Sequence, residues 1–142
     1  MKTKIITLLL CINISATIFA QDSDYKFIEK TVSYYLDGGT NNDFETLKKA
    51  FHETATMKFI RNGEYKEVNA IKFFKKAVKP GPKQNRDTRI AYINVTGNVA
   101  SAKLEIDYDT FSFIDYMNLI KIDGEWKVVS KIFYRKSKSS NK

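Results

Sequence analysis

The chain has 142 residues, 43% hydrophobic and 28% charged, which allows one domain with a real core and little else. Its formal net charge is +8, but residues 1–20 contribute two charges and the tail from Arg135 onward four, so the folded part is near +2. So small a charge argues against a nucleic-acid partner, and the single cysteine, Cys11, excludes an intramolecular disulfide.

Residues 1–20 have the pattern of a secretory signal peptide. Lys2 and Lys4 precede an apolar run, and Phe19-Ala20 is followed by polar residues, as cleavage requires. The run is short for a membrane span and polar residues interrupt it. We expect an exported protein, periplasmic or secreted, with no membrane attachment after cleavage. A retained signal anchor is the alternative.

The first helix of the folded part is expected from Asp22 or Ser23 to about Asp37. Its apolar side chains recur at the spacing of one helical face. They are Phe27, Ile28, Val32, Tyr35 and Leu36. Gly38-Gly39 should end the helix, because glycine alone enters the left-handed C-terminal conformation at little cost.

A second, shorter helix is expected to begin at Asn42, which has Glu45 three residues later in the manner of a capping box. One face of this helix would carry Phe44, Leu47, Lys48 and Phe51. His52 would close the helix just before the first strand.

A hairpin and a third helix follow. Thr54–Ile60 is rich in strand formers, and Asn62-Gly63 is a two-residue turn that leads into a short return strand, Glu64–Val68. The third helix is expected over Ala70–Val78, and Pro80-Gly81-Pro82 ends it.

The rest of the chain is expected to form four strands joined by two-residue turns at Gly97-Asn98, Asp109-Thr110 and Asp123-Gly124. Each turn sets the register of the strands that it joins, and together they gather apolar side chains on one face, which the helices would cover. This inner face comprises Ile93, Val95, Ala100, Ala102, Leu104, Ile106, Tyr108, Phe111, Phe113, Met117, Leu119, Trp126, Val128 and Ile132.

Asp115 is the one charged residue on the inner face. The turns pair Ala91 with Leu104, Leu104 with Asp115, and Asp115 with Ile132. An acid in such surroundings must be paired, reach water in a cavity, or be protonated. Asp115 could then act as a proton donor or base. Alternatively, it binds a buried donor such as His52, a tyrosine hydroxyl or an arginine, and serves only the fold.

The outer face of the sheet is also rich in apolar residues, which on a soluble protein usually meet a partner. It would carry Ile114, Tyr116, Ile120, Ile122, Val129 and Phe133 among Asn118, Lys127 and Lys131. We therefore expect a homodimer through this face, with Lys131 in a surface or interface role.

The order helix, helix, hairpin, helix and four-stranded meander resembles the nuclear transport factor 2-like fold, also called SnoaL-like or cystatin-like. The resemblance is strongest to its putative lumazine-binding family, through residues 32–39, 51–57 and above all 113–133. It implies an α+β cone of three helices on a curved, mainly antiparallel sheet of about six strands. That domain would span residues 21–135, with a basic disordered tail over 136–142.

The resemblance also implies a pocket in the mouth of the cone. We expect Tyr35, Tyr108, Phe111, Phe113 and Met117 to bind a ligand there. Asp115 is the first catalytic candidate, and His52, at the rim of the cone in such folds, is the second. The chain has no second histidine, so we expect no metal site, and no cofactor.

Three functions remain open from the sequence. The first is a domain that binds a small apolar or aromatic ligand without established catalysis. The second is an isomerase, dehydratase or cyclase with Asp115 as acid or base. The third is a structural or protein-interaction domain whose cone is filled by its own side chains.

Overall fold

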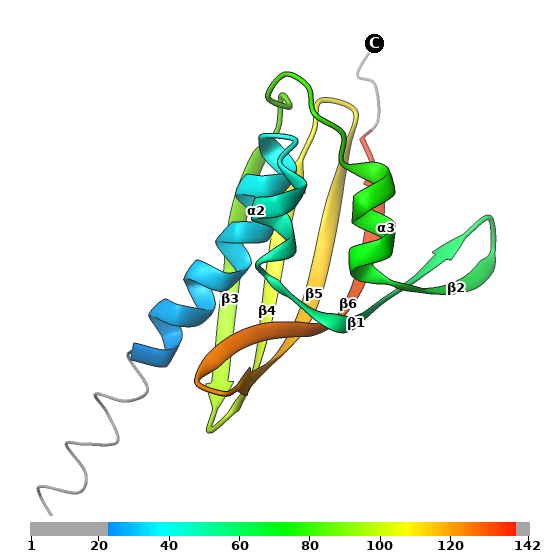
Figure 1. Ribbon diagram of the computed structural model, residues 1–142. Coiled ribbons are helices and arrows are strands. Elements are labelled where there is room, and N and C mark those ends of the chain that lie inside the picture. Colours follow the sequence, from blue (N-terminus) through cyan, green and yellow to red (C-terminus); the bar gives the residue numbers. More distant parts are fainter. Residues whose placement is uncertain (1–22, 139–142) are drawn as a thin grey trace, which may run out of the picture.

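The computed structural model describes residues 23–138 (Figure 1). The expected signal peptide and residues 139–142 lie outside the described residues. A helix over residues 23–40 comes first. None of the helices within residues 23–138 has the length and apolar character that a membrane-spanning helix needs. The labelled elements that follow are α2 (Phe44–Lys48), β1 (Phe51–Arg61), β2 (Glu64–Asn69), α3 (Ala70–Ala77), β3 (Asp87–Thr96), β4 (Val99–Asp107), β5 (Phe111–Ile122) and β6 (Glu125–Ser137).

The six strands form one curved sheet in the order β2-β1-β6-β5-β4-β3. All neighbouring strands are antiparallel except β1 and β6, which are parallel. The helices lie on one side of the sheet, in its concavity (Figure 1). The expected α+β cone is therefore confirmed.

The N-terminal helix (residues 23–40) continues past Gly38-Gly39, so the expected stop at these glycines is wrong. Neither has a positive φ; the left-handed residue after the helix is Asn42, with φ 54°. A Cβ on Gly38 would lie 2.7 Å from the Cα of Leu47, so Gly38 is required for close packing against α2.

The second helix is shorter than expected. Its N-cap is Asp43 rather than Asn42, because the Asp43 side chain accepts the Thr46 backbone N–H. The helix ends at Lys48, and Phe51 and His52 belong to β1. His52 is therefore a strand residue and does not close a helix.

The predicted register of the meander is confirmed at its turns. Thr96 pairs with Val99, and Leu104 pairs with Asp115. Gly97, Asp123 and Gly124 have positive φ, as two-residue turns require.

Two β-bulges break the predicted register away from the turns. One lies at Ala91, so that Ile90, and not Ala91, pairs with Leu104. The other lies at Val129, where β6 leaves the simple antiparallel register with β5. An extra residue in one strand reverses the facing of every residue beyond it.

Because of the bulge at Val129, three residues of β6 lie on the opposite face of the sheet from the one predicted. Asp115 pairs with Phe133 instead of Ile132. Lys131 and Phe133 therefore lie on the inner face, where Lys131 is 3% exposed, whereas Ile132 lies outside and is 50% exposed. β6 pairs with β5 on one side and with β1 on the other, and a bulge bends the strand that contains it.

The C-terminal boundary also differs from the prediction. β6 continues to Ser137, and the backbone N–H of Lys138 donates to the carbonyl of Thr110. The ammonium of Lys138 also binds Asp107 at 3.0 Å. Residues 136–138 are thus part of the ordered domain rather than of a disordered tail.

Candidate functional site

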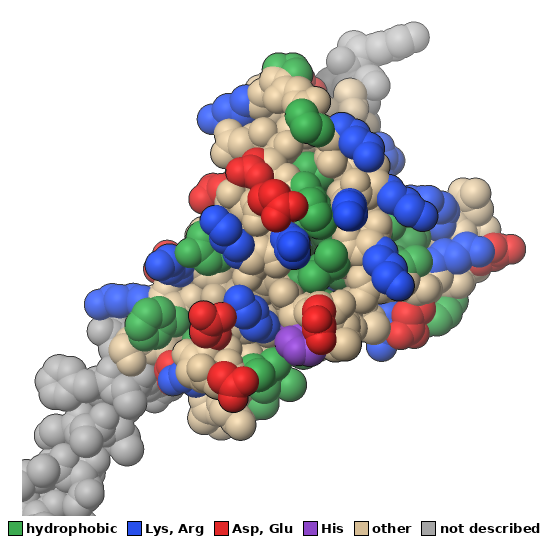
Figure 2. Space-filling model, viewed as in Figure 1, with side chains coloured by type: hydrophobic (Ala, Val, Ile, Leu, Met, Phe, Trp, Pro, Cys, Tyr) green, Lys and Arg blue, Asp and Glu red, His purple; other side chains and the backbone are tan. Residues whose placement is uncertain are grey.

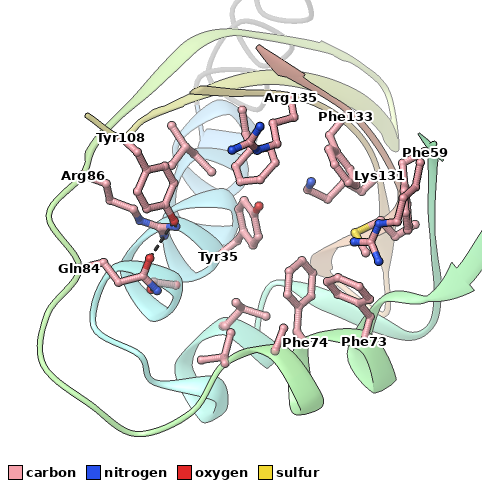
Figure 3. Close-up of a pocket in the computed structure, with 18 of the residues that line it drawn as sticks. Tyr35, Phe59, Phe73, Phe74, Gln84, Arg86, Tyr108, Lys131, Phe133 and Arg135 are labelled. Carbon is pink, nitrogen blue, oxygen red and sulfur yellow. Dashed lines mark hydrogen bonds between the residues drawn. The ribbon is translucent and has the colours of Figure 1, made fainter. Parts of the chain in front are cut away.

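A cavity of about 530 Å³ lies between the inner face of the sheet and the helices. Its walls are mainly aromatic and aliphatic, with Phe73 and Phe74 from α3 opposite Phe133 from β6 (Figure 3). Phe113 from β5 also lines the cavity. The rings of Phe113 and Phe133 meet edge to face with centroids 5.5 Å apart. The cone is therefore not filled by its own side chains.

Three polar side chains meet at the floor of the cavity. The Tyr35 hydroxyl donates to Oδ2 of Asp115 at 2.7 Å, and the Lys131 ammonium donates to Oδ1 at 2.8 Å. Asp115 is fully buried beneath them and does not line the cavity, whereas Tyr35 and Lys131 do. Asp115 thus has two buried donors, one of them the expected tyrosine hydroxyl and the other a lysine.

Burial changes the acid–base properties of both donors. It lowers the pKa of Lys131 from its ordinary value of 10.5, although the neighbouring Asp115 carboxylate partly opposes that change. Burial, reinforced by the same carboxylate, raises the pKa of Tyr35 well above 10.0. The phenol therefore stays a hydrogen-bond donor at neutral pH, and the amine loses its proton more readily than a surface lysine does.

A polar network forms another wall of the cavity, where the loop between α3 and β3 meets the N-terminal helix. The Tyr108 hydroxyl donates to Gln84 at 2.7 Å and accepts from Arg86 at 2.8 Å (Figure 3). Arg86 also donates to the Thr40 hydroxyl and to the Leu36 carbonyl at the end of the helix. These three hydrogen bonds of the Arg86 guanidinium fix the loop against the N-terminal helix.

The structure brings some of the predicted site residues together and separates others. Tyr35, Tyr108 and Phe113 line the cavity. Phe111 stacks on Tyr108 with centroids 4.5 Å apart and supports the wall from behind, and Met117 is buried in the core. These two do not line the cavity.

His52 is not part of the cavity. Its Nδ1 lies 2.8 Å from the hydroxyl of Thr54, a neighbour on the same strand, and the residue is absent from the cavity lining. Of the alternative partners considered for Asp115, the structure shows a tyrosine hydroxyl and not His52: the Asp115 oxygens accept from Tyr35 and Lys131.

Sequence reasoning missed Lys131, Arg86 and Arg135 as cavity residues. A signal existed for Lys131, because a buried acid demands a donor and the bulge supplies one two residues along β6. Arg86 lies in a loop, where no periodicity indicates which way a side chain points.

Comparisons with known proteins agree with this architecture. The sequence model of the family described as putative lumazine-binding matches residues 23–134. Aldolase FrzH from Cladobotryum sp is 23% identical over 114 residues, which cover 79% of this chain and 91% of that protein.

Two solved structures show the same fold. A nuclear transport factor 2-like protein of unknown function from Shewanella baltica OS155 has a TM-score of 0.72 and 30% identity, covering 80% of this chain and 94% of that one. A ketosteroid isomerase-like protein from Erwinia carotovora atroseptica SCRI1043 has a TM-score of 0.63 and 9% identity, covering 79% and 95%. At 9% identity the second likeness concerns the fold alone.

Proposed function

This chain belongs to the putative lumazine-binding family, and from that premise we propose that it binds a small apolar or aromatic molecule in the cavity of the cone. The observation that carries the proposal is the cavity of about 530 Å³, whose phenylalanine walls leave polar groups only at the floor, one wall and the mouth. Small-molecule sites are typically concave and mostly apolar, with a few polar groups that fix orientation.

Binding is favoured over catalysis by Asp115 for a geometric reason. The carboxylate is fully buried, and both its oxygens are engaged at 2.7 and 2.8 Å by side chains that lie between it and the cavity. A general acid or base must come within hydrogen-bond reach of the reacting proton. Asp115 therefore acts on a ligand only through Tyr35 or Lys131.

A neutral fluorescent probe, phenylnaphthylamine, tests the proposal. We expect saturable binding to the wild-type protein at one site. Ala77→Trp should weaken this binding at least about tenfold, because Ala77 is an exposed residue of the cavity lining and an indole there would obstruct the opening. Lys76→Trp is the matched control, since it adds the same indole on the same helix at an exposed residue outside the cavity lining. Equal binding by the wild type and Ala77→Trp would overturn the proposal.

A second candidate function is amine chemistry at Lys131. The observation that favours it is a buried lysine, of lowered pKa, whose side chain lines the cavity. Its unprotonated Nζ could attack a ligand carbonyl carbon, forming a C–N bond and releasing water to leave an imine. The aldolase among the relatives is consistent with carbonyl chemistry on this fold.

Reductive trapping tests the second candidate. With benzaldehyde and sodium borohydride, Lys131 should be converted to a secondary amine faster than the exposed lysines, as seen by peptide mass mapping. Lys127→Met, which removes a more exposed lysine of the same strand, should leave the labelling of Lys131 unchanged. Labelling spread evenly over the surface lysines, with Lys131 spared, would contradict amine chemistry.

We also propose that a second copy of the chain covers the outer face of the sheet. This face exposes large side chains of β5 and β6, among them Tyr116 at 43%, Ile132 at 50% and Tyr134 at 64%. Sedimentation equilibrium should give twice the chain mass at micromolar concentration; the mass of a single chain would count against the dimer.

A further inference from the structure

The charges that line the cavity are strongly unbalanced. Among the described residues that line the cavity, four are cationic and none is an Asp or a Glu. The four are Arg61, Arg86, Lys131 and Arg135. A cavity built only to hold a neutral apolar ligand has no need of this excess of positive charge.

Two of the four cations are already engaged inside the protein. The charge of Lys131 is offset by Asp115 at 2.8 Å, so the floor of the cavity is close to neutral. Arg86 donates to Thr40, Tyr108 and the Leu36 carbonyl. The charge of Lys131 is thus compensated by a carboxylate, and Arg86 is held in place by three internal hydrogen bonds.

The other two cations, Arg135 and Arg61, are exposed and lie where the cavity opens. The Arg135 guanidinium lies 4.0 Å from the ring centroid of Phe111, and that of Arg61 lies 5.2 Å from Phe59. Stacking on a ring face leaves the in-plane N–H donors of a guanidinium free. Within residues 23–138, neither arginine forms an ion pair with an acidic side chain.

We infer that the ligand is an amphipathic anion, with an apolar or aromatic body against the phenylalanine walls and an oxyanion, such as a carboxylate or sulfonate, held by Arg135 and assisted by Arg61 at the mouth. This inference rests on the proposed function, because it names the class of molecule that the cavity takes. The guanidinium fork matches an oxyanion in shape and charge, and such charge-assisted hydrogen bonds are stronger than neutral ones.

The surroundings of the mouth favour the same class of ligand. Lysine and arginine side chains gather over α3 and beside the hairpin of β1 and β2 (Figure 2). On α3 they include Lys72, Lys75 and Lys76, on the helix whose Phe73 and Phe74 line the cavity. A basic surface beside an opening attracts anions, and salt weakens that attraction.

A pair of matched probes tests the inference. Anilinonaphthalene sulfonate has nearly the same aromatic body as phenylnaphthylamine but carries a sulfonate. We expect the wild-type protein to bind the sulfonate about tenfold or more tightly than the neutral probe at low salt, and we expect the difference to shrink as salt is added.

Charge-removing variants locate the anion. Arg135→Gln should remove most of the preference for the sulfonate over the neutral probe, with a smaller effect in Arg61→Gln. Lys136→Gln is the matched control: it makes the same charge change at the next residue of β6, which is exposed and outside the cavity lining. It should keep the preference. Thermal melts of both variants should match the wild type, because Arg135 and Lys136 are exposed.

The outcomes separate this inference from the proposed function. If Ala77→Trp blocks the neutral probe while the sulfonate binds no more tightly than the neutral probe, the pocket stands and the anionic class is overturned. A preference that survives in both Arg135→Gln and Arg61→Gln also overturns it. If Ala77→Trp affects neither probe, the proposed function itself fails.

Discussion

Replacing Lys131 with methionine is expected to lower the free energy of unfolding by about 3–5 kcal/mol. The methionine would fill a similar space, but within residues 23–138 it would leave the fully buried Asp115 carboxylate with Tyr35 as its one remaining side-chain donor. An uncompensated charge of that kind is among the most costly defects a core can contain. Urea denaturation followed by circular dichroism measures the loss.

A double-mutant cycle shows whether the loss comes from the ion pair. Because Asn at position 115 is uncharged, Asp115→Asn combined with Lys131→Met should be clearly more stable than Lys131→Met alone. The control is Lys127→Met, which breaks a partly exposed pair with Glu125 at 3.0 Å and should cost less than about 1 kcal/mol. Additive losses in the cycle would show that Lys131 and Asp115 are not coupled.

Replacing Gly38 with alanine is expected to destabilise the domain by about 2–3 kcal/mol, although alanine is ordinarily the better helix residue by about 1 kcal/mol. The added Cβ would lie 2.7 Å from the Cα of Leu47 and 2.8 Å from the carbonyl oxygen of Asp43. Both are backbone atoms, so the whole of α2 would have to move. Thermal unfolding should show a clearly lower midpoint.

Two further variants calibrate that result. At Gly39 the added Cβ would meet the end of the Arg86 side chain, which can move if it gives up its hydrogen bonds, so Gly39→Ala should cost less than Gly38→Ala. Asp37→Ala, at an exposed residue of the same helix, should change stability by no more than about 0.5 kcal/mol. A stabilised Gly38→Ala protein would mean that the helix and α2 are not held in close contact.

The sequence predicts the architecture well because turns and periodicity are local. Asn62-Gly63 and Asp123-Gly124 lie where the backbone takes positive φ, and the register they set holds for as long as the strands stay regular. From that register Asp115 could be placed on the inner face beside Leu104, as it is observed.

The site was harder to predict because it depends on features with no local signal. The bulge at Val129 arises where β6 must also pair with β1, a strand far away in the sequence, and it moves Lys131 from the outer face to the floor of the cavity. Gly38 is of the residue type that typically ends a helix, yet its role is to let α2 pack closely against the N-terminal helix. Both outcomes depend on contacts between distant segments.

The place of β6 in the sheet also bears on how the chain acquires its structure. The last of the six described strands to be synthesised lies in the interior of the sheet, between β1 and β5. Until Glu125–Ser137 has emerged from the ribosome, the β1–β2 hairpin and the β3-β4-β5 meander are two separate pieces, each with an open edge. The domain therefore cannot close before β6 has emerged, and we expect its folding to be limited by the joining of segments that are distant in the sequence.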